Sequence, residues 1–205
     1  MNTDAEGPHY HHGDLRNALL AAAEQLLVEQ GVAGLSLRAV AKQAGVSHAA
    51  PYRHFRDKAA LLRALAQSGF ERLAAVILAA TETVSHSPEQ KLLEAGVAYV
   101  RLAVDQPEIS QLMFGGGIKP QGDMAYRQVA RAAFDALVEI IQEGVRTGAF
   151  RDRDPQELAL VAWTAMHGMA MLMTAHLLDT DSTGAAGVDE QVRSVARNVI
   201  YGISK

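Results

Sequence analysis

Apolar residues recur at intervals of three and four along most of the chain, and no segment alternates as a half-buried strand would. This spacing is typical of amphipathic helices, which capping and turn residues separate from one another. The predicted helices cover residues 14–30, 37–44, 47–55, 57–83, 87–106, 107–114, 123–148, 154–178 and 188–203. Asp14 is the expected N-cap of the first helix, and Gly31 follows its end. The sequence therefore predicts an all-α fold.

Residues 37–55 have the outline of a helix-turn-helix. Apolar positions keep one face of the first short helix against a core, and Gly45 supplies the left-handed residue that ends it. Ser47 is expected to cap the second helix by accepting a hydrogen bond from a free backbone N–H. Pro51 removes one N–H near the start of that helix, so we expect a slight distortion there. A short helix of this kind, supported by another helix, fits the DNA major groove.

Positive charge is concentrated around this motif. Residues 36–63 contain six basic residues and one acid, a local net charge of +5, so the rest of the chain carries −9 within a total of −4. Phosphate contacts need local positive charge and not a basic protein, so the acidic remainder does not argue against DNA binding. The asymmetry predicts a cationic head on an acidic body.

Two later helix starts have capping residues followed by proline, namely Ser87-Pro88-Glu89-Gln90 and Asp154-Pro155-Gln156-Glu157. The second start precedes residues 158–178, a run of 21 residues without Asp, Glu, Lys or Arg, which is long enough to span a bilayer. Histidines, threonines and alanines make this run a poor membrane span. Burial on two sides, against the chain's own core and against a partner subunit, explains the pattern better, and we expect no membrane partner.

The chain of 205 residues contains no cysteine, which excludes disulfides and cysteine-based zinc fingers. Its N-terminus has no cationic stretch followed by an apolar run, so a cytoplasmic location is expected. The sequence also lacks a glycine-rich phosphate loop, a G-x-S-x-G elbow and an H-E-x-x-H motif. We therefore expect no enzyme activity, no catalytic residues, no metal and no cofactor.

Three segments together resemble the N-terminal DNA-binding domain of TetR-type transcriptional regulators: YHHGDLR at 10–16, GVAGLSLRAVAKQAGVSHAAPYRHF at 31–55, and DKAALL at 57–62. The similarity covers roughly the first third of the chain. It implies a DNA-binding head at residues 1–60 and a helical effector-binding and dimerisation body at residues 61–205. Further on, Trp163, His167 and Gly168 resemble the W-x-x-x-H-G signature of one C-terminal subgroup.

The head contains the expected DNA contacts. The exposed N-terminal end of the recognition helix, where such helices meet base edges, is expected to carry Ser47, His48, Ala49 and Ala50. The small side chains offer few hydrogen bonds, so direct readout is assigned to Ser47, His48 and Arg53. Tyr52 and Lys58 match family positions that hold DNA phosphates. The full set of expected contacts is Ser36, Arg38, Ser47, His48, Ala49, Ala50, Tyr52, Arg53, His54 and Lys58.

Two groups of residues each have two interpretations. His9, His11 and His12 could bind a metal, but no acidic or sulfur ligand stands at a suitable spacing, and a flexible arm along the DNA backbone fits them better. In the body, Trp163 and His167 share a helix with several methionines, which form either a core or the wall of an apolar effector pocket. The candidate pocket residues are Tyr99, Met113, Phe114, Trp163, Met166, His167 and Met169.

The resemblance implies a homodimer that binds double-stranded DNA and a small-molecule effector, more often a repressor than an activator. The effector would move the helix at 57–83 and change the separation of the two heads. The last two long helices are expected to form a four-helix bundle across the dimer axis. Two other hypotheses remain: a ligand-binding or scaffolding helical protein with a DNA-silent head, and a non-specific architectural DNA binder.

Overall fold

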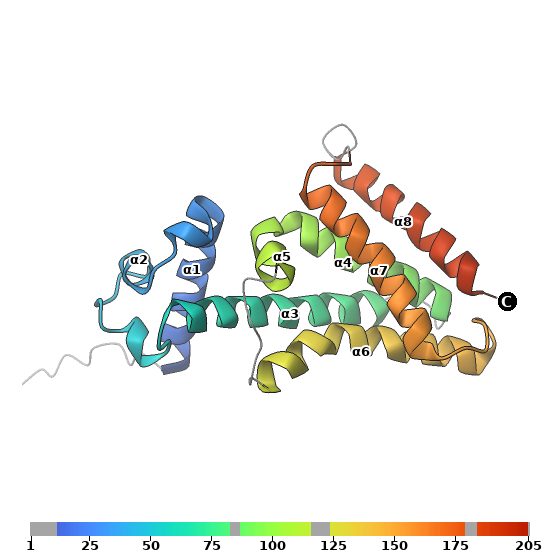
Figure 1. The fold of residues 1–205 in the computed structure, drawn as a ribbon, viewed down its shortest axis with the longest axis horizontal. Coiled ribbons are helices and arrows are strands. Elements are labelled where there is room, and N and C mark those ends of the chain that lie inside the picture. Colours follow the sequence, from blue (N-terminus) through green and yellow to red (C-terminus); the bar gives the residue numbers. More distant parts are fainter. Residues whose placement is uncertain (1–11, 83–86, 116–123, 179–183, 205) are drawn as a thin grey trace, which may run out of the picture.

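The computed structural model describes residues 12–82, 87–115, 124–178 and 184–204. This part of the chain is helical almost throughout (Figure 1). Within it, the only β-type pairing is an isolated antiparallel bridge between Phe150 and Ser204. The expected all-α fold is confirmed. The elements are α1 (His12–Gly34), α2 (Leu37–Gln43), the 3-10 turn η1 (Pro51–Arg53), α3 (Lys58–Glu82), α4 (Pro88–Asp105), α5 (Pro107–Phe114), α6 (Met124–Thr147), α7 (Pro155–Thr174) and α8 (Gly184–Ile203).

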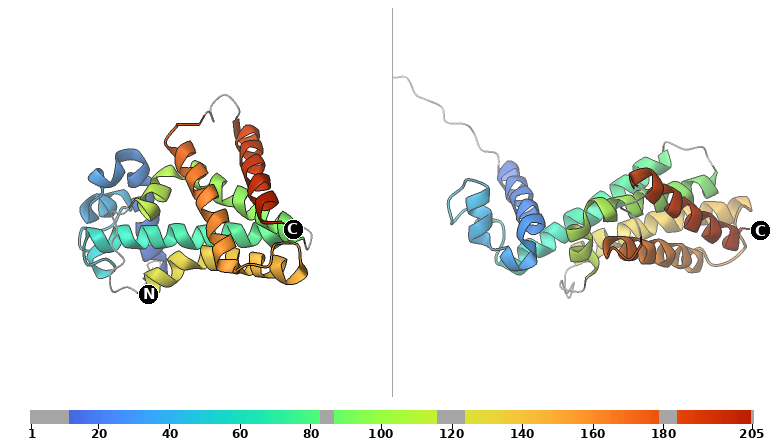
Figure 2. Two further views of the ribbon diagram at one scale, coloured as in Figure 1. Left: turned by 45° about the vertical axis from the view of Figure 1, so that its right-hand side comes forward. Right: turned by 90° about the horizontal axis from the view of Figure 1, so that it is seen from above.

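The long helix α3 connects a small head to a larger body. It contacts α1 near its start and packs against α4, α5 and α6 further along. At the far end, α7 lies against α4 and α6, and α8 lies against α4 and α7. Figure 2 shows the head, with α1 and α2, at one end of an elongated molecule and α8 toward the other. The expected boundary between residues 60 and 61 falls inside α3, so one continuous helix belongs to both parts.

The core follows α3 from the head into the body. Leu61, Leu65 and Leu73 are buried along it. At Gly69 a Cβ atom would lie 2.5 Å from the sulfur of Met113, so α5 packs directly on the backbone of α3. A second buried cluster surrounds Phe150, where α6, α7 and the end of α8 meet. The first cluster contains buried residues of both the head and the body, and the second packs the helices at the far end of the body against one another.

Several predicted helix ends are confirmed. Gly45 has a φ of 68°, and its N–H donates to the Lys42 carbonyl while the next N–H, of Val46, donates to Ala41. Asp57 accepts from the Ala60 N–H at 2.8 Å and so caps α3. This hydrogen bond, with a second one from Arg56, lowers the pKa of the Asp57 carboxyl. At the start of α7, the Asp154 side chain accepts from the Gln156 N–H at 2.9 Å.

Two predicted N-caps are wrong. The helix α1 begins at His12, two residues before Asp14, so Asp14 lies inside the helix. Ser87 occupies the N-cap position of α4, but its hydroxyl donates to the Glu89 carboxylate and makes no capping bond to the backbone. The side chain is therefore turned toward the acid in the first turn, whose carboxylate accepts a charge-assisted hydrogen bond, and its oxygen caps no backbone N–H. The predicted ends at Thr83 and Asp123 lie outside the described residues.

The apolar helix α7 is shorter than expected. It ends at Thr174, because His176 adopts a left-handed conformation with a φ of 54° and the Leu177 N–H turns back to the Leu172 carbonyl at 2.9 Å. One side of α7 is buried against the body, whereas Leu160 and Val161 on its other side are more than half exposed. Among the described residues, no helix is long and apolar enough to cross a membrane.

Candidate DNA interface and effector site

The recognition segment is not the α-helix that the sequence predicts. Residues 47–50 form a turn in which the Ala50 N–H donates to the Ser47 carbonyl at 3.0 Å, and the 3-10 turn η1 follows. Pro51 has no N–H to pair with that carbonyl in an α-helical register, so its effect is larger than the slight distortion expected. Ser47 thus acts as an acceptor through its backbone, and the predicted side-chain cap is wrong.

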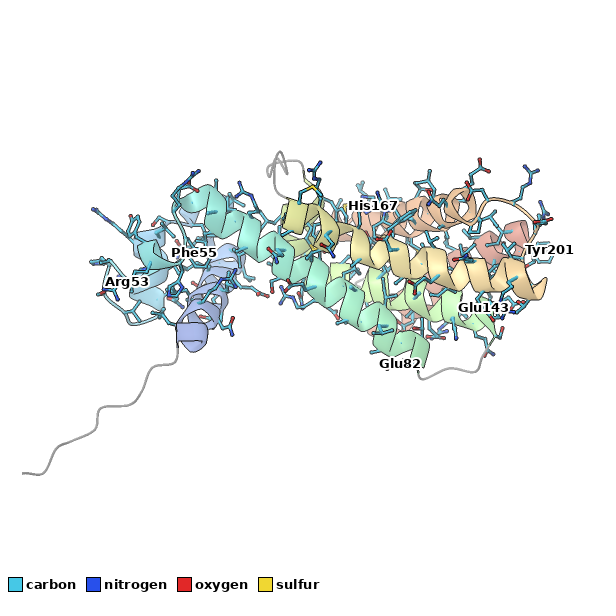
Figure 3. The ribbon with its side chains drawn as sticks, turned by 90° about the horizontal axis from the view of Figure 1, so that it is seen from below. Arg53, Phe55, Glu82, Glu143, His167 and Tyr201 are labelled. Carbon is cyan, nitrogen blue, oxygen red and sulfur yellow. The ribbon has the colours of Figure 1, made fainter. Side chains whose placement is uncertain are left out.

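Most of the expected DNA-contacting side chains lie on the surface of the head. Figure 3 places Arg53 at its outer end, far from Tyr201 at the opposite end of the molecule. Tyr52 is 54% exposed, although it is aromatic. The exposed members are Ser36, Arg38, Ser47, His48, Ala49, Tyr52 and Arg53, and the half-buried members are Ala50, His54 and Lys58. The hydroxyl of Ser36 also caps α2, since it accepts from the Ala39 N–H at 3.1 Å.

Two basic residues beside η1 add details that the sequence did not indicate. The ammonium group of Lys58 donates to the Val32 carbonyl at 2.6 Å, at the C-terminal end of α1. This bond uses one of the three N–H donors of the ammonium group, so Lys58 can hold α1 and contact a phosphate at the same time. Arg56 was absent from the expected contacts, yet its side chain is 91% exposed and pairs with Asp57 at 3.1 Å. The local excess of positive charge in the sequence was the signal that could have added Arg56 to the expected DNA contacts.

An aromatic cluster joins the helices of the body. The ring centroids of Tyr99 in α4 and Trp163 in α7 are 5.1 Å apart, and those of Phe114 in α5 and His167 in α7 are 4.7 Å apart. Edge-to-face contacts extend the cluster to α3 and α6 through Phe70, Tyr126 and Phe134. Residues from five helices thus meet at one place between the head and the distal end.

One hydrogen bond crosses this cluster. The hydroxyl of Tyr99 lies 2.7 Å from Nδ1 of His167, and the Tyr99 side chain is buried. Burial raises the pKa of Tyr99 and lowers the pKa of His167, because both charged forms lose hydration. Both groups are therefore neutral near pH 7, and one donates to the other.

The cluster separates two spaces. The inner cavity has a volume of about 30 Å³ and is bounded by Tyr99, Trp163 and Met166 among other apolar residues. A groove of about 500 Å³ lies on the other side, where α1, α3, α5 and α7 approach one another, and Phe114 and His167 form part of its wall. The inner cavity accommodates no more than water, whereas the groove has the size of a ligand site.

Two of the candidate pocket residues line neither space. Met113 is packed on Gly69 at the contact between α5 and α3, and Met169 is buried in the main core. Their side chains fill the gaps between helices, as flexible thioethers commonly do. Of the N-terminal histidines, His9 and His11 lie outside the described residues and His12 begins α1. No cluster of three or more His, Asp or Glu side chains suited to a metal is present in the described part of the chain.

Comparison with known families accounts for both parts of the molecule. Residues 19–65 match the family described as bacterial regulatory proteins, tetR family, and residues 92–195 match the tetracyclin repressor-like C-terminal domain. The second match alone covers half of the chain. The chain belongs to the TetR family. Members of this family are generally DNA-binding transcriptional regulators and not enzymes.

Individual relatives agree with this assignment. The chain is 50% identical over 52 residues to the class A tetracycline repressor from transposon 1721 of Escherichia coli, a match that covers 25% of this chain and 24% of that protein. It is 30% identical over 131 residues to an HTH-type transcriptional regulator of Mycobacterium tuberculosis, which covers 62% and 56% of the two chains. A Rhodococcus sp. RHA1 protein of unknown function has a similar structure, with a TM-score of 0.85 and 39% identity over 97% of this chain and 100% of that one.

The lowered pKa of His167 predicts a pH dependence of stability in this TetR-family protein. The unfolded chain protonates this histidine near its ordinary pKa of about 6.5, whereas the folded chain resists protonation until a lower pH. The contribution of His167 to stability is thus present above about pH 6.5 and is lost as the pH falls toward the lowered value. Between pH 7.5 and 5.5, urea unfolding should show that the free energy of unfolding falls more steeply for the wild type than for His167→Gln. Parallel curves for the two proteins would contradict the lowered pKa of His167.

Proposed function

We propose that this protein is a dimeric, ligand-responsive repressor that binds a palindromic operator and releases it when a small-molecule effector binds the body. The observation that carries the proposal is the helix-turn-helix at the outer end of α3, with an excess of basic residues and an exposed surface around η1. Local positive charge supplies the affinity for phosphates, and the exposed side chains of Ser47, His48 and Arg53 are available for base edges.

The outer surface of α7 and α8 supports the proposed dimer. Six of the eleven large hydrophobic side chains exposed on the described chain lie on these helices or on the turn after α7. They are Leu160, Val161, Leu172, Leu177, Val195 and Tyr201. The buried side of α8 carries Val188 and Val192 instead, so the valines of this helix are divided between the protomer's core and its surface. A second copy covering the exposed face would complete the four-helix arrangement.

The position of α5 supports a response to an effector. This short helix contacts α1 in the head, packs on α3 at Gly69, and contributes Phe114 to the aromatic cluster. A ligand that displaces Phe114 therefore acts on an element that contacts both the head and the helix connecting it to the body. Such a ligand lowers DNA affinity only if it binds the DNA-free conformation more tightly than the DNA-bound one. By the same coupling, DNA lowers the affinity for the ligand by an equal factor.

Substitutions in the head test DNA binding. We expect Lys58→Ala to weaken binding to all duplexes by a similar factor and to reduce the salt dependence by about two phosphates per dimer, one for each head. We expect His48→Ala to change base preference, because its side chain is exposed within the turn that precedes η1. The measurement is selection of bound fragments from random duplex DNA, followed by gel-shift titrations at several salt concentrations.

Lys91→Ala, a lysine substitution in the body, is the matched control and should leave DNA binding unchanged. If wild-type protein selects no palindrome yet binds all duplexes equally, the protein is a non-specific binder. If it binds no duplex at physiological salt, the head is silent toward DNA and the proposed function is wrong.

A further inference from the structure

The groove between the head and the body has no assigned occupant. Its volume of about 500 Å³ lies within the range of about 300 to 1,000 Å³ typical of ligand sites, whereas the inner cavity of about 30 Å³ is far below it. Its walls come from the end of α1, the start of α3, one side of α5 and the second half of α7. A ligand here contacts both parts of the molecule at once.

The lining of this groove is mostly apolar and contains one charged side chain. The apolar residues are Leu27, Val32, Leu62, Leu112, Phe114 and Met171. The charged one is Glu108, in the first turn of α5, and no basic side chain of the described residues forms an ion pair with it. His167 adds an imidazole that burial keeps neutral. The site therefore combines hydrophobic surface with a single negative charge.

The charge of Glu108 decides which ligands fit. A ligand that fills the groove removes water from the carboxylate, and burying a charge without a partner is costly. A neutral apolar molecule leaves that cost uncompensated, and an anion adds repulsion to it. A cation with an apolar body compensates the charge and buries its own hydrophobic surface against the same walls.

We propose that the groove binds an amphiphilic organic cation, with its ammonium group beside Glu108 and its apolar part against Leu112, Phe114 and Met171. This inference rests on the proposed effector response and names the chemical class of the effector. It also places the effector in the groove, on the head side of the Tyr99–His167 pair, and not in the inner cavity.

The rim of the groove provides a route to the DNA-binding surface. Val32, which lines the groove, accepts the hydrogen bond from Lys58 at 2.6 Å. Gly31 beside it has a φ of 66° and interrupts the helical backbone of α1, and it lines the groove as well. A ligand packed against this segment displaces the Val32 carbonyl, which positions the Lys58 ammonium group. Because the same ammonium group is the expected phosphate contact, its displacement weakens DNA binding, so the cation and DNA oppose each other.

Three probes with the same alkyl chain test the ligand class: octyltrimethylammonium, 1-octanol and octanoate, each below its micelle-forming concentration. Trp163, the single tryptophan, lies 6.4 Å from Phe114 between ring centroids, so its fluorescence reports occupancy of the groove. We expect the ammonium compound to bind wild-type protein at least about tenfold more tightly than octanol, with octanoate weakest. Equal binding of the ammonium compound and octanol would overturn the proposal.

Variants of the groove separate charge recognition from folding. We expect Glu108→Gln to remove the preference for the ammonium compound, and Gln111→Glu, which adds a second carboxylate to the groove, to strengthen it. Glu139→Gln makes the same charge change on the exposed face of α6 and should leave the preference intact. An unchanged preference in both groove variants would contradict the assignment even if one of them were unstable.

Release of selected duplex DNA links the site to regulation. We expect octyltrimethylammonium to release DNA from wild-type protein, and Glu108→Gln to need at least about tenfold more of it while binding DNA normally in its absence. If wild-type protein binds no DNA, the proposed function fails, and the charge preference measured by fluorescence still decides the ligand class. If DNA binds but the cation neither binds nor releases it, only the ligand inference is wrong.

Discussion

Replacing Leu160 with aspartate is expected to convert the protein into a monomer and to abolish specific DNA binding. The side chain of Leu160 is 55% exposed on the outer face of α7, beside Val161, which is 52% exposed. In the proposed dimer this face is covered, and a carboxylate there would be buried against apolar side chains without a partner. In a dimer, the binding of one head to its half-site raises the effective concentration of the second head at the other half-site. A monomer lacks this gain, so its affinity for the operator should fall by about 100-fold or more.

The matched control is Leu78→Asp, at a leucine that is 56% exposed on α3 and far from α7 and α8 along the chain. It introduces the same charge and the same loss of helix propensity, and it should leave both association and DNA binding intact. On α8, Val195→Asp should reproduce the effect of the Leu160 variant. Analytical ultracentrifugation at micromolar concentration measures the association directly. A wild-type monomer, or a Leu160 variant that stays dimeric, would refute the proposed interface.

The largest loss of stability is expected from Phe150→Ala. The Phe150 side chain is fully buried between α6, α7 and the end of α8, and its N–H donates to the Gly144 carbonyl at 3.0 Å. A Cβ atom at Gly144 would overlap the Phe150 ring, so the ring occupies the space that the glycine leaves on α6. Removing the ring creates a cavity that rigid helices cannot close, at a cost of about 3 to 5 kcal/mol. For a chain of 205 residues, the melting temperature should fall on the order of 10 °C.

Tyr52→Ala is the comparison for this experiment. Tyr52 is also aromatic but is 54% exposed, so the same truncation should change the free energy of unfolding by only about 0.5 kcal/mol. Urea unfolding followed by circular dichroism measures both variants. A loss below about 1 kcal/mol for Phe150→Ala would mean that neighbouring side chains collapse into the space, contrary to the packing described.

Local chemistry in the sequence was sufficient for the helical fold and for several of its boundaries. The caps at Asp57 and Asp154 and the left-handed Gly45 depend on backbone groups no more than four residues away, so they were predictable from neighbours in the sequence. The same holds for the amphipathic spacing that indicates which faces are buried. Where two local preferences competed, as at Ser87 with Glu89 and at Ser47 with Pro51, the sequence alone predicted the wrong outcome.

The candidate site was only partly predictable. The sequence indicated Tyr99, Phe114, Trp163 and His167 as a group, but it did not reveal the hydrogen bond between Tyr99 and His167, which are 68 positions apart. It left open whether Met113 and Met169 line a pocket or fill the core, because a methionine on a helix looks the same in sequence in both cases, and the structure packs both into the core. The groove, where Glu108 lies among apolar residues of four helices, could not be predicted from the sequence, because its walls come from segments far apart along the chain.

By itself the sequence determined the helices, the basic head and the family, since each of these depends on residue type and on spacing within a few turns. Only the tertiary structure decided the burial of Phe150, the bond from Lys58 to Val32, and the separation of the groove from the inner cavity. These features arise where segments distant in sequence approach one another. The distances and crossing angles of packed helices depend on the combined shapes of their side chains, which a one-dimensional pattern does not contain.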